Sequence, residues 1–218
     1  DKFKYFETED QLNAIAEIKS DMIAPFPMDR LLCGDVGFGK TEVAFRAVFK
    51  AILSGKQACM MAPTTILAMQ HYDTATARFK EFPIKIAMIS RFTGAKEKRA
   101  LLEGLKSGRI DFVIGTHSLL SKDIEFKDLG LLIIDEEQMF GVRQKERIKA
   151  LNENVDILTL SATPIPRTLD MALSGIREIS YLENPPFERK SVDTCVQPID
   201  YDEISKIIMR ERDRHGQV

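Results

Sequence analysis

Eight residues from Gly34 to Thr41 follow the pattern G-x-x-x-x-G-K-T, which is typical of loops that bind nucleotide phosphates. Glycines let backbone N–H groups approach the phosphates, and the helix that follows points its N-terminal dipole at the anion. In such a loop Lys40 contacts the β- and γ-phosphates, and the Thr41 hydroxyl binds Mg²⁺. The pattern therefore predicts a nucleotide site made of Gly34, Asp35, Val36, Gly37, Phe38, Gly39, Lys40, Thr41 and Glu42.

Two carboxylates, Asp135 and Glu136, follow the apolar run 131–134. We expect Asp135 to hold Mg²⁺ through its water shell, opposite Thr41. Glu136 would orient and deprotonate the attacking water, so Lys40, Asp135 and Glu136 are the predicted catalytic residues. The alternative is an acidic helix N-terminus stabilised by the helix dipole, and the phosphate loop upstream makes it the weaker one.

Gln11 has two interpretations of equal weight. As the third residue after Thr8 it completes a capping box at the start of an amphipathic helix. Alternatively, its amide reads the edge of an adenine ring on which Phe6 stacks, because both residues lie shortly before the phosphate loop.

Short apolar runs that read as strands alternate with helical patterns along the chain. Helices are expected from Thr8 to the Pro25-Phe26-Pro27 break, and over 42–50, 66–79 and 96–107. This alternation predicts an α/β fold of three layers, in which helices flank a mostly parallel central sheet. The polar motifs follow the predicted strands, and ligands bind at the carboxyl ends of such strands. The predicted strands are 31–33, 57–62, 84–89, 111–114, 129–134, 156–160 and 179–182.

The composition is that of a soluble globular protein. The chain has 218 residues, 44% hydrophobic and 29% charged, and a net charge of −2 that gives no overall signal for nucleic acid. No apolar run is long enough to span a membrane, and no secretory signal opens the sequence, so a cytoplasmic location is expected. Cys33 and Cys59 lie within apolar runs and are expected to be buried free thiols.

The motifs, taken in order, resemble the superfamily 2 helicases and translocases. The longer strings are similar to the family of bacterial transcription-repair coupling factors, and the similarity covers essentially the whole chain. These strings are GDVGFGKTEVA (34–44), PTTILA (63–68), ISRF (89–92), GTHSLL (115–120), LLIIDEE (131–137), FGVRQKERIKAL (140–151) and LTLSATPIPRTL (158–169).

The resemblance implies one RecA-like lobe of a double-stranded DNA translocase that hydrolyses ATP with Mg²⁺ and displaces stalled RNA polymerase. Excision-repair proteins are further implied partners, reached together with the polymerase through domains outside this chain. By the same resemblance, Phe6 and Gln11 bind adenine. The residues that would face the DNA backbone are Thr64, Thr65, Arg91, Thr116 and His117, although Thr64 and Thr65 also fit helix N-caps. His117 also fits a structural histidine.

Three further residues are expected to couple nucleotide state to DNA: Gln138, Ser161 and Thr163. Gln138 departs from the family, which usually has histidine there, and an amide cannot titrate. We expect residues 1–190 to form the ATP-binding lobe, and residues 191–218 to be a linker and the start of a second lobe that supplies arginine fingers. The alternatives are a branched-DNA fork-repair translocase and a nucleotide-dependent DNA-binding module without coupled hydrolysis.

Overall fold

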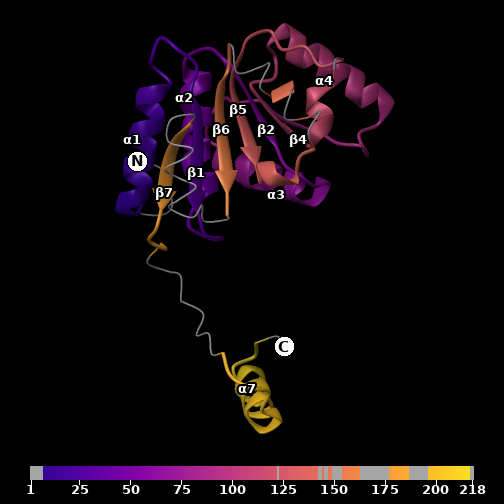
Figure 1. Cartoon of the computed structure of the whole chain (residues 1–218). Helices are drawn as coiled ribbons and strands as arrows, with labels where there is room; N and C mark the ends of the chain where they lie inside the picture. The colour runs from indigo at the N-terminus through magenta and orange to yellow at the C-terminus, as the bar shows by residue number, and fades with distance from the viewer. Residues whose placement is uncertain are drawn as a thin grey trace. The chain divides into compact units, whose positions relative to one another are not determined.

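The computed structural model describes residues 7–121, 123–141, 144, 147–148, 154–162, 177–186 and 196–216. The chain divides into two compact units, Asp1–Phe187 and Glu188–Val218. Helix α7 (Tyr201–Asp213) belongs to the second unit. The elements of the first unit (Figure 1) are α1 Glu9–Asp21, β1 Asp29–Gly34, α2 Lys40–Leu53, β2 Gln57–Met61, α3 Thr65–Arg78, β3 Ile86–Ile89, α4 Ala95–Ser107, β4 Phe112–Gly115, the 3₁₀ helix η1 His117–Leu120, β5 Leu129–Asp135, the 3₁₀ helix η2 Glu137–Met139, β6 Asp156–Ser161 and β7 Glu178–Leu182.

The seven strands form one sheet in the order β3-β4-β2-β5-β6-β1-β7, and every neighbouring pair is parallel. The predicted α/β fold with a parallel sheet is confirmed, and each predicted strand is present. Parallel strands place all their carboxyl ends at one edge of the sheet, and the arrows in Figure 1 point to it. The polar motifs after β1, β2, β3, β4, β5 and β6 therefore gather at this edge.

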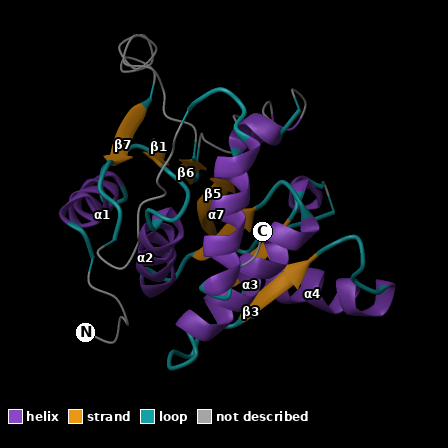
Figure 2. Cartoon of the chain, turned by 90° about the horizontal axis from the view of Figure 1, so that it is seen from below, coloured by secondary structure: helices purple, strands orange, loops and turns teal. Residues whose placement is uncertain are grey.

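Helices cover both faces of the sheet, as the alternation of side chains along the strands requires. On one face, Leu131 and Ile133 of β5 pack in a core with buried residues of α1, α2 and α3. On the other face, Leu132 and Ile134 pack with Leu105 of α4. Figure 2 shows β7, β1, β6 and β5 in succession, with α1 and α2 together on one side of them. These three layers are those predicted.

Several local predictions are also confirmed. Thr8 caps α1 in a capping box with Gln11, and α4 ends at Gly108, whose φ of 73° is left-handed. Cys33 and Cys59 are buried free thiols. Burial raises the pKa of the Cys59 thiol to about 12, which keeps it protonated and unreactive.

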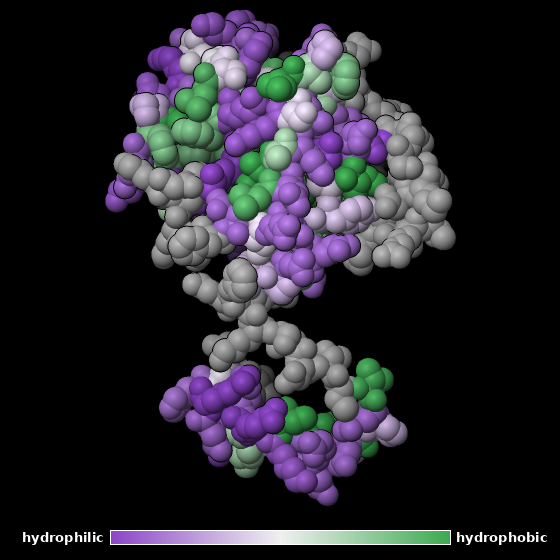
Figure 3. Space-filling model, turned by 90° about the vertical axis from the view of Figure 1, so that its left-hand side faces the viewer, coloured by the Kyte–Doolittle hydropathy of each residue, from purple (hydrophilic) through white to green (hydrophobic). Residues whose placement is uncertain are grey.

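Helix α7 begins at Asp200, whose carboxylate accepts hydrogen bonds from the backbone N–H groups of Asp202 and Glu203. The helix exposes apolar side chains, and hydrophobic atoms are visible on this unit in Figure 3. The exposed apolar residues of this unit are Val196, Ile199, Tyr201, Ile204, Ile207, Ile208 and Met209.

Across the described residues, no helix of the chain is both long and apolar enough to span a membrane.

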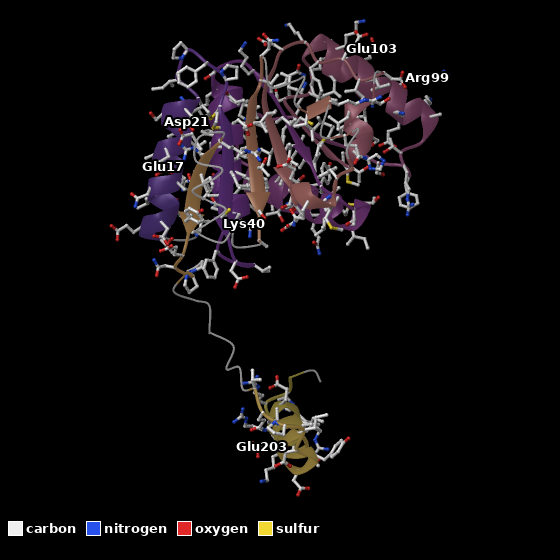
Figure 4. The ribbon with its side chains drawn as sticks, viewed as in Figure 1. Glu17, Asp21, Lys40, Arg99, Glu103 and Glu203 are labelled. Carbon is white, nitrogen blue, oxygen red and sulfur yellow. The ribbon has the colours of Figure 1, made fainter. Side chains whose placement is uncertain are left out.

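The buried guanidinium of Arg30 joins α1 to the two outer strands β1 and β7. Arg30 of β1 is 6% exposed and donates to Asp21 Oδ2 at 2.6 Å, Glu17 Oε2 at 3.0 Å and Ser180 Oγ at 2.8 Å. Figure 4 shows Glu17 and Asp21 on α1 beside the sheet. These bonds connect three segments, α1, β1 and β7, that border the phosphate loop.

Replacing Arg30 with methionine should lower the free energy of unfolding by about 2 to 4 kcal/mol, because removing one partner of a buried ion pair leaves the others desolvated and unpaired. The half-exposed Glu17 places the expected cost below that of a fully buried pair. Urea unfolding followed by circular dichroism measures the change. Arg99→Met, at an exposed residue of α4, is the matched control and should shift the urea midpoint little. Equal midpoints for the two variants would contradict a structural role for Arg30.

Candidate nucleotide-binding site

The phosphate-binding sequence forms a turn between β1 and α2 at the carboxyl edge of the sheet. Gly37 and Gly39 both have a φ of 83°, a conformation that residues with a side chain rarely adopt. Among the described residues no side chain caps the N-terminus of α2, where Gly39 is the N-cap. The first turn of a fourteen-residue helix thus presents its backbone N–H groups at this turn.

Other segments approach the loop closely at Gly34 and at Gly39. A side chain at Gly34 would lie 2.9 Å from Leu182 Cβ, so this glycine lets β7 pack closely against β1. A side chain at Gly39 would collide with Gln11 Nε2. Gly39 is therefore required both by its backbone conformation and by the approach of α1.

Gln11 holds α1 against the phosphate loop. Its Oε1 accepts a hydrogen bond from Thr8 N at 3.2 Å, and its Nε2 donates to Phe38 O at 2.8 Å. The capping interpretation is thus correct, and the same amide also binds the loop. Each amide atom can make two hydrogen bonds, and among the described residues one donor and one lone pair of the Gln11 amide have no partner. The two interpretations of Gln11 are compatible.

Lys40 lies at the centre of the site. Its amine donates to Gly34 O at 2.5 Å and to Asp35 O at 3.1 Å, both in the loop. Burial lowers the pKa of this amine, whereas the nearby carboxylates of Glu136 and Asp135 act in the opposite direction. Figure 4 labels Lys40 at the edge of the sheet where the strands end. The loop and the acidic motif, about a hundred residues apart in sequence, are therefore electrostatic neighbours.

Strand β6 holds these two parts together. It lies between β1 and β5, with Leu160 opposite Asp135 and Ser161 opposite Cys33. Past the end of β5, Glu136 N donates to Leu160 O at 3.0 Å. Glu136 itself has a left-handed backbone, with φ 52° and ψ 59°, which ends the strand abruptly. The backbone therefore changes direction between Asp135 and Glu136.

Each residue of the acidic motif has a side-chain partner. His71 Nε2 of α3 lies 2.8 Å from Asp135 Oδ2. Gln138 donates a hydrogen bond to Glu136 Oε2, and Glu137 Oε2 accepts from Arg177 Nη1 at 2.8 Å. Arg177 also forms an ion pair with Asp29 at the start of β1. His71 and Arg177 could not be predicted from the sequence, because a lone histidine in a helix and an arginine before a strand carry no local signal.

The oxygen donors at this edge suit Mg²⁺. The ion prefers hard oxygen ligands and is usually bound by one or two carboxylates together with substrate phosphates and water. The Thr41 hydroxyl and the Asp135 carboxylate are of that type. Among the described residues, no cluster of three or more His, Cys, Asp or Glu side chains could hold a metal by itself.

Glu42 is engaged within the protein. Its Oε1 pairs with Arg78 of α3, and Arg46 lies 3.9 Å away. Burial raises the pKa of the Glu42 carboxyl, and the charge of Arg78 opposes that shift. Glu42 thus joins α2 to α3 beside the phosphate loop.

The five residues expected to face DNA lie after β2, β3 and β4 at the same edge of the sheet. Thr64 is exposed and caps α3, accepting from Leu67 N at 3.2 Å, and Thr65 is half-buried. Arg91 is exposed, with its guanidinium 4.8 Å from the centre of the Phe92 ring. Thr116 is buried, its hydroxyl 3.3 Å from that of Ser118, whereas His117 is exposed.

Of the three residues expected to couple nucleotide and DNA, two lie among the described residues: Gln138, which is exposed beside Glu136, and Ser161, which is buried at the end of β6. Thr163 lies outside the described residues, as does Phe6 of the expected adenine site. A cavity of about 280 Å³ lies at the opposite edge of the sheet, between Pro25, Lys50 and Asp156.

Residues 8–172 match the model of the DEAD/DEAH box helicase family. The chain belongs to this family. The matched residues include the phosphate loop after β1 and the acidic motif after β5.

Individual relatives narrow the resemblance. The transcription-repair-coupling factors of Staphylococcus epidermidis and Bacillus subtilis are each 58% identical over 216 residues, 99% of this chain. The predicted similarity to that family is confirmed. The chain spans 18% of the length of these relatives.

Solved structures agree on the fold. RecG bound to a three-way DNA junction superposes with a TM-score of 0.82 at 40% identity, covering 96% of this chain and 28% of RecG. The Hef helicase domain of Pyrococcus furiosus superposes with a TM-score of 0.58 at 20% identity, covering 79% of this chain and 37% of Hef. The latter likeness concerns the fold alone.

Alanine substitutions at two glycines with left-handed backbones distinguish the cost of backbone strain from the cost of crowding against Gln11. Gly55 has a φ of 77°, and a methyl group added there would meet nothing within 4 Å, so Gly55→Ala should cost about 1 to 2 kcal/mol from the backbone alone. Gly39→Ala should cost about 1 kcal/mol more, because Gln11 must abandon a hydrogen bond. Urea unfolding measures both.

The excess cost of Gly39→Ala should disappear when Gln11 is replaced by alanine, since the collision is then removed. An excess that persists in the Gln11→Ala background would show that Gln11 does not crowd the loop.

Proposed function

We propose that residues 1–190 form an ATP-binding and ATP-hydrolysing lobe of a double-stranded DNA translocase. The observation that carries the proposal is the placement of Lys40, which follows β1, beside Asp135 and Glu136 at the end of β5, the two strands that flank β6. A phosphate-binding amine, a metal-binding carboxylate and a second carboxylate at one edge are the parts that hydrolysis of a nucleotide needs. Membership of the helicase family supports ATP as the substrate.

Each part has a proposed role. The backbone of the loop and the Lys40 amine bind the β- and γ-phosphates, and Lys40 exchanges the carbonyls of Gly34 and Asp35 for phosphate oxygens. Thr41 and Asp135 would hold Mg²⁺, which would supply positive charge next to the phosphates. Glu136 orients water and accepts its proton. Gln11 and Phe6 are proposed to bind the adenine, Gln11 through the amide positions that Thr8 and Phe38 leave available.

Duplex DNA is the proposed second substrate. Thr64, Arg91 and His117 are exposed and lie after three adjacent strands, β2, β3 and β4, so they can contact successive phosphates. Thr65 and Thr116 are less exposed and would support them. Hydroxyl, guanidinium and imidazole groups bind a phosphate backbone without reading its sequence, as a translocase requires.

A second lobe is proposed to complete the site. Transition-state charge on a transferring phosphate needs arginine side chains that a single lobe of this kind lacks. Residues 191–218 are proposed to be a linker and the beginning of that lobe. The partly exposed apolar face of α7, which includes Ile204, Ile207 and Ile208, supports this assignment, because a helix face of this kind is normally covered by further structure. Gln138, Ser161 and Thr163 would relay closure of the lobes to the DNA contacts.

Displacement of stalled RNA polymerase and cooperation with excision-repair proteins are proposed for the whole protein, on the basis of the 58% identity to transcription-repair-coupling factors. The RecG likeness favours a second candidate, a translocase on branched DNA. A third is a binding module in which Gln138, bonded to Glu136, leaves hydrolysis uncoupled. The first two candidates are distinguished by comparing two activities of the whole protein: release of a stalled polymerase and remodelling of a three-way junction.

Replacing Lys40 with alanine should weaken Mg-ATP binding by about tenfold to a hundredfold, because a charge-assisted hydrogen bond to phosphate is lost. Lys80→Ala, at an exposed lysine after the end of α3, is the matched control and should bind like the parent. Titration with a fluorescent ATP analogue measures both affinities. Equal binding by the Lys40 variant and the parent would refute the phosphate-loop assignment.

Hydrolysis should depend on the second lobe. The 218-residue chain should turn over Mg-ATP slowly, and a chain extended through the second lobe should be faster and further stimulated by duplex DNA. Glu136→Gln in the extended chain should abolish turnover while ATP binding persists. Equal, DNA-independent turnover by both chains would instead indicate a self-contained nucleotidase.

A further inference from the structure

A histidine on α3 is bonded to the carboxylate that is proposed to hold the metal. His71 Nε2 lies 2.8 Å from Asp135 Oδ2, and the two side chains are only 12% and 13% exposed. The residues are 64 positions apart in the sequence. A polar pair that is shielded from water in this way has a fixed geometry, because neither group can exchange its partner for solvent without cost.

The fold explains why these two groups meet. Side chains of β5 alternate between the faces of the sheet, so Asp135 points to the same face as Leu131 and Ile133, the face that α3 covers. On α3, His71 is three residues after Ala68 and four before Ala75, which are both fully buried. Small alanines bring the helix close to the sheet, and the imidazole then reaches the end of β5.

The direction of the hydrogen bond between His71 and Asp135 follows from the chemistry of the two groups. A carboxylate only accepts hydrogen bonds, so the proton lies on His71 Nε2 and is donated to Oδ2. This bond fixes the rotation of the Asp135 carboxylate and engages Oδ2, so that Oδ1 is the oxygen left to meet a ligand at the strand end. Groups that orient a metal ligand in this way commonly change metal affinity by about tenfold to a hundredfold when they are removed.

We propose that His71 is a positioning residue that holds the Asp135 carboxylate in the orientation needed for Mg²⁺ at the nucleotide site. The role rests on the proposed function, because it concerns the metal that accompanies ATP. His71 touches neither the nucleotide nor the ion in this scheme; it acts through Asp135. The helix that carries it begins at Thr64, a proposed DNA contact, so one rigid element joins the two proposed sites.

The test is the dependence of nucleotide binding on Mg²⁺ in the 218-residue chain. A fluorescent ATP analogue is titrated at fixed concentration with Mg²⁺, and separately in EDTA. His71→Leu, which keeps the volume and removes the donor, should raise the Mg²⁺ midpoint by about tenfold or more and leave binding in EDTA unchanged. His71→Gln, which retains an N–H donor, should recover part of the loss.

Gln70→Leu is the matched control, because Gln70 is the neighbouring, exposed residue of the same helix. It should leave the Mg²⁺ midpoint unchanged. A variant that merely loosened the fold would weaken binding with and without Mg²⁺ alike, and that outcome for His71→Leu would overturn the proposal. An unchanged midpoint in His71→Leu would overturn it as well.

The hydrogen bond is tested independently of any nucleotide by NMR of the imidazole. The Nε2 proton of His71 should be protected from solvent exchange in the parent chain and lose that protection in Asp135→Ala. Protection that survives in Asp135→Ala would overturn the pairing. Failure of the parent to bind the ATP analogue under all conditions would overturn the proposed function, and the metal role of His71 with it, while the NMR result would still report the pair.

Discussion

The backbone hydrogen bonds of β6 hold together the two parts of the candidate site. The strand pairs with β1 on one side and with β5 on the other, so the phosphate loop and the acidic motif each follow a strand adjacent to it. The bond from Glu136 N to Leu160 O extends this pairing beyond the end of β5. Because parallel strands buried on both faces cannot slip by one residue without inverting every side chain, the spacing between Lys40 and the carboxylates is fixed by the core.

Around that frame, side chains of the surrounding helices set the details. Gln11 of α1 binds the loop at Phe38, Glu42 of α2 pairs with Arg78 of α3, and His71 of α3 binds Asp135. The three helices on one face of the sheet are thereby linked to the site, and Glu42 also links α2 to α3. A displacement of any one of them would alter the positions of groups proposed to bind phosphate, metal or DNA.

Much of this arrangement could be predicted from the sequence. The strands are apolar runs bounded by glycine, proline or polar residues, and the phosphate loop depends on residues adjacent in the chain, so both leave a local pattern. The strand order leaves none, because the insertion of β6 between β1 and β5 is decided by long-range packing. The bonds of His71 to Asp135 and of Arg177 to Glu137 join residues 64 and 40 positions apart and were missed for the same reason. The cap that Gln11 forms with Thr8 could be predicted because the two residues are close in sequence, whereas its contact with the distant Phe38 could not.

At Glu136, the residue that would be most stable in the left-handed backbone conformation differs from the residue that the proposed chemistry needs. Glycine would adopt a φ of 52° without steric cost, and asparagine with little, whereas glutamate adopts it at a cost of about 1 to 2 kcal/mol. A selection for thermal stability alone would therefore favour glycine at this position and remove the carboxylate proposed to activate water. The strain at the end of β5 therefore supports the role proposed for Glu136, and neither burial nor composition would reveal it.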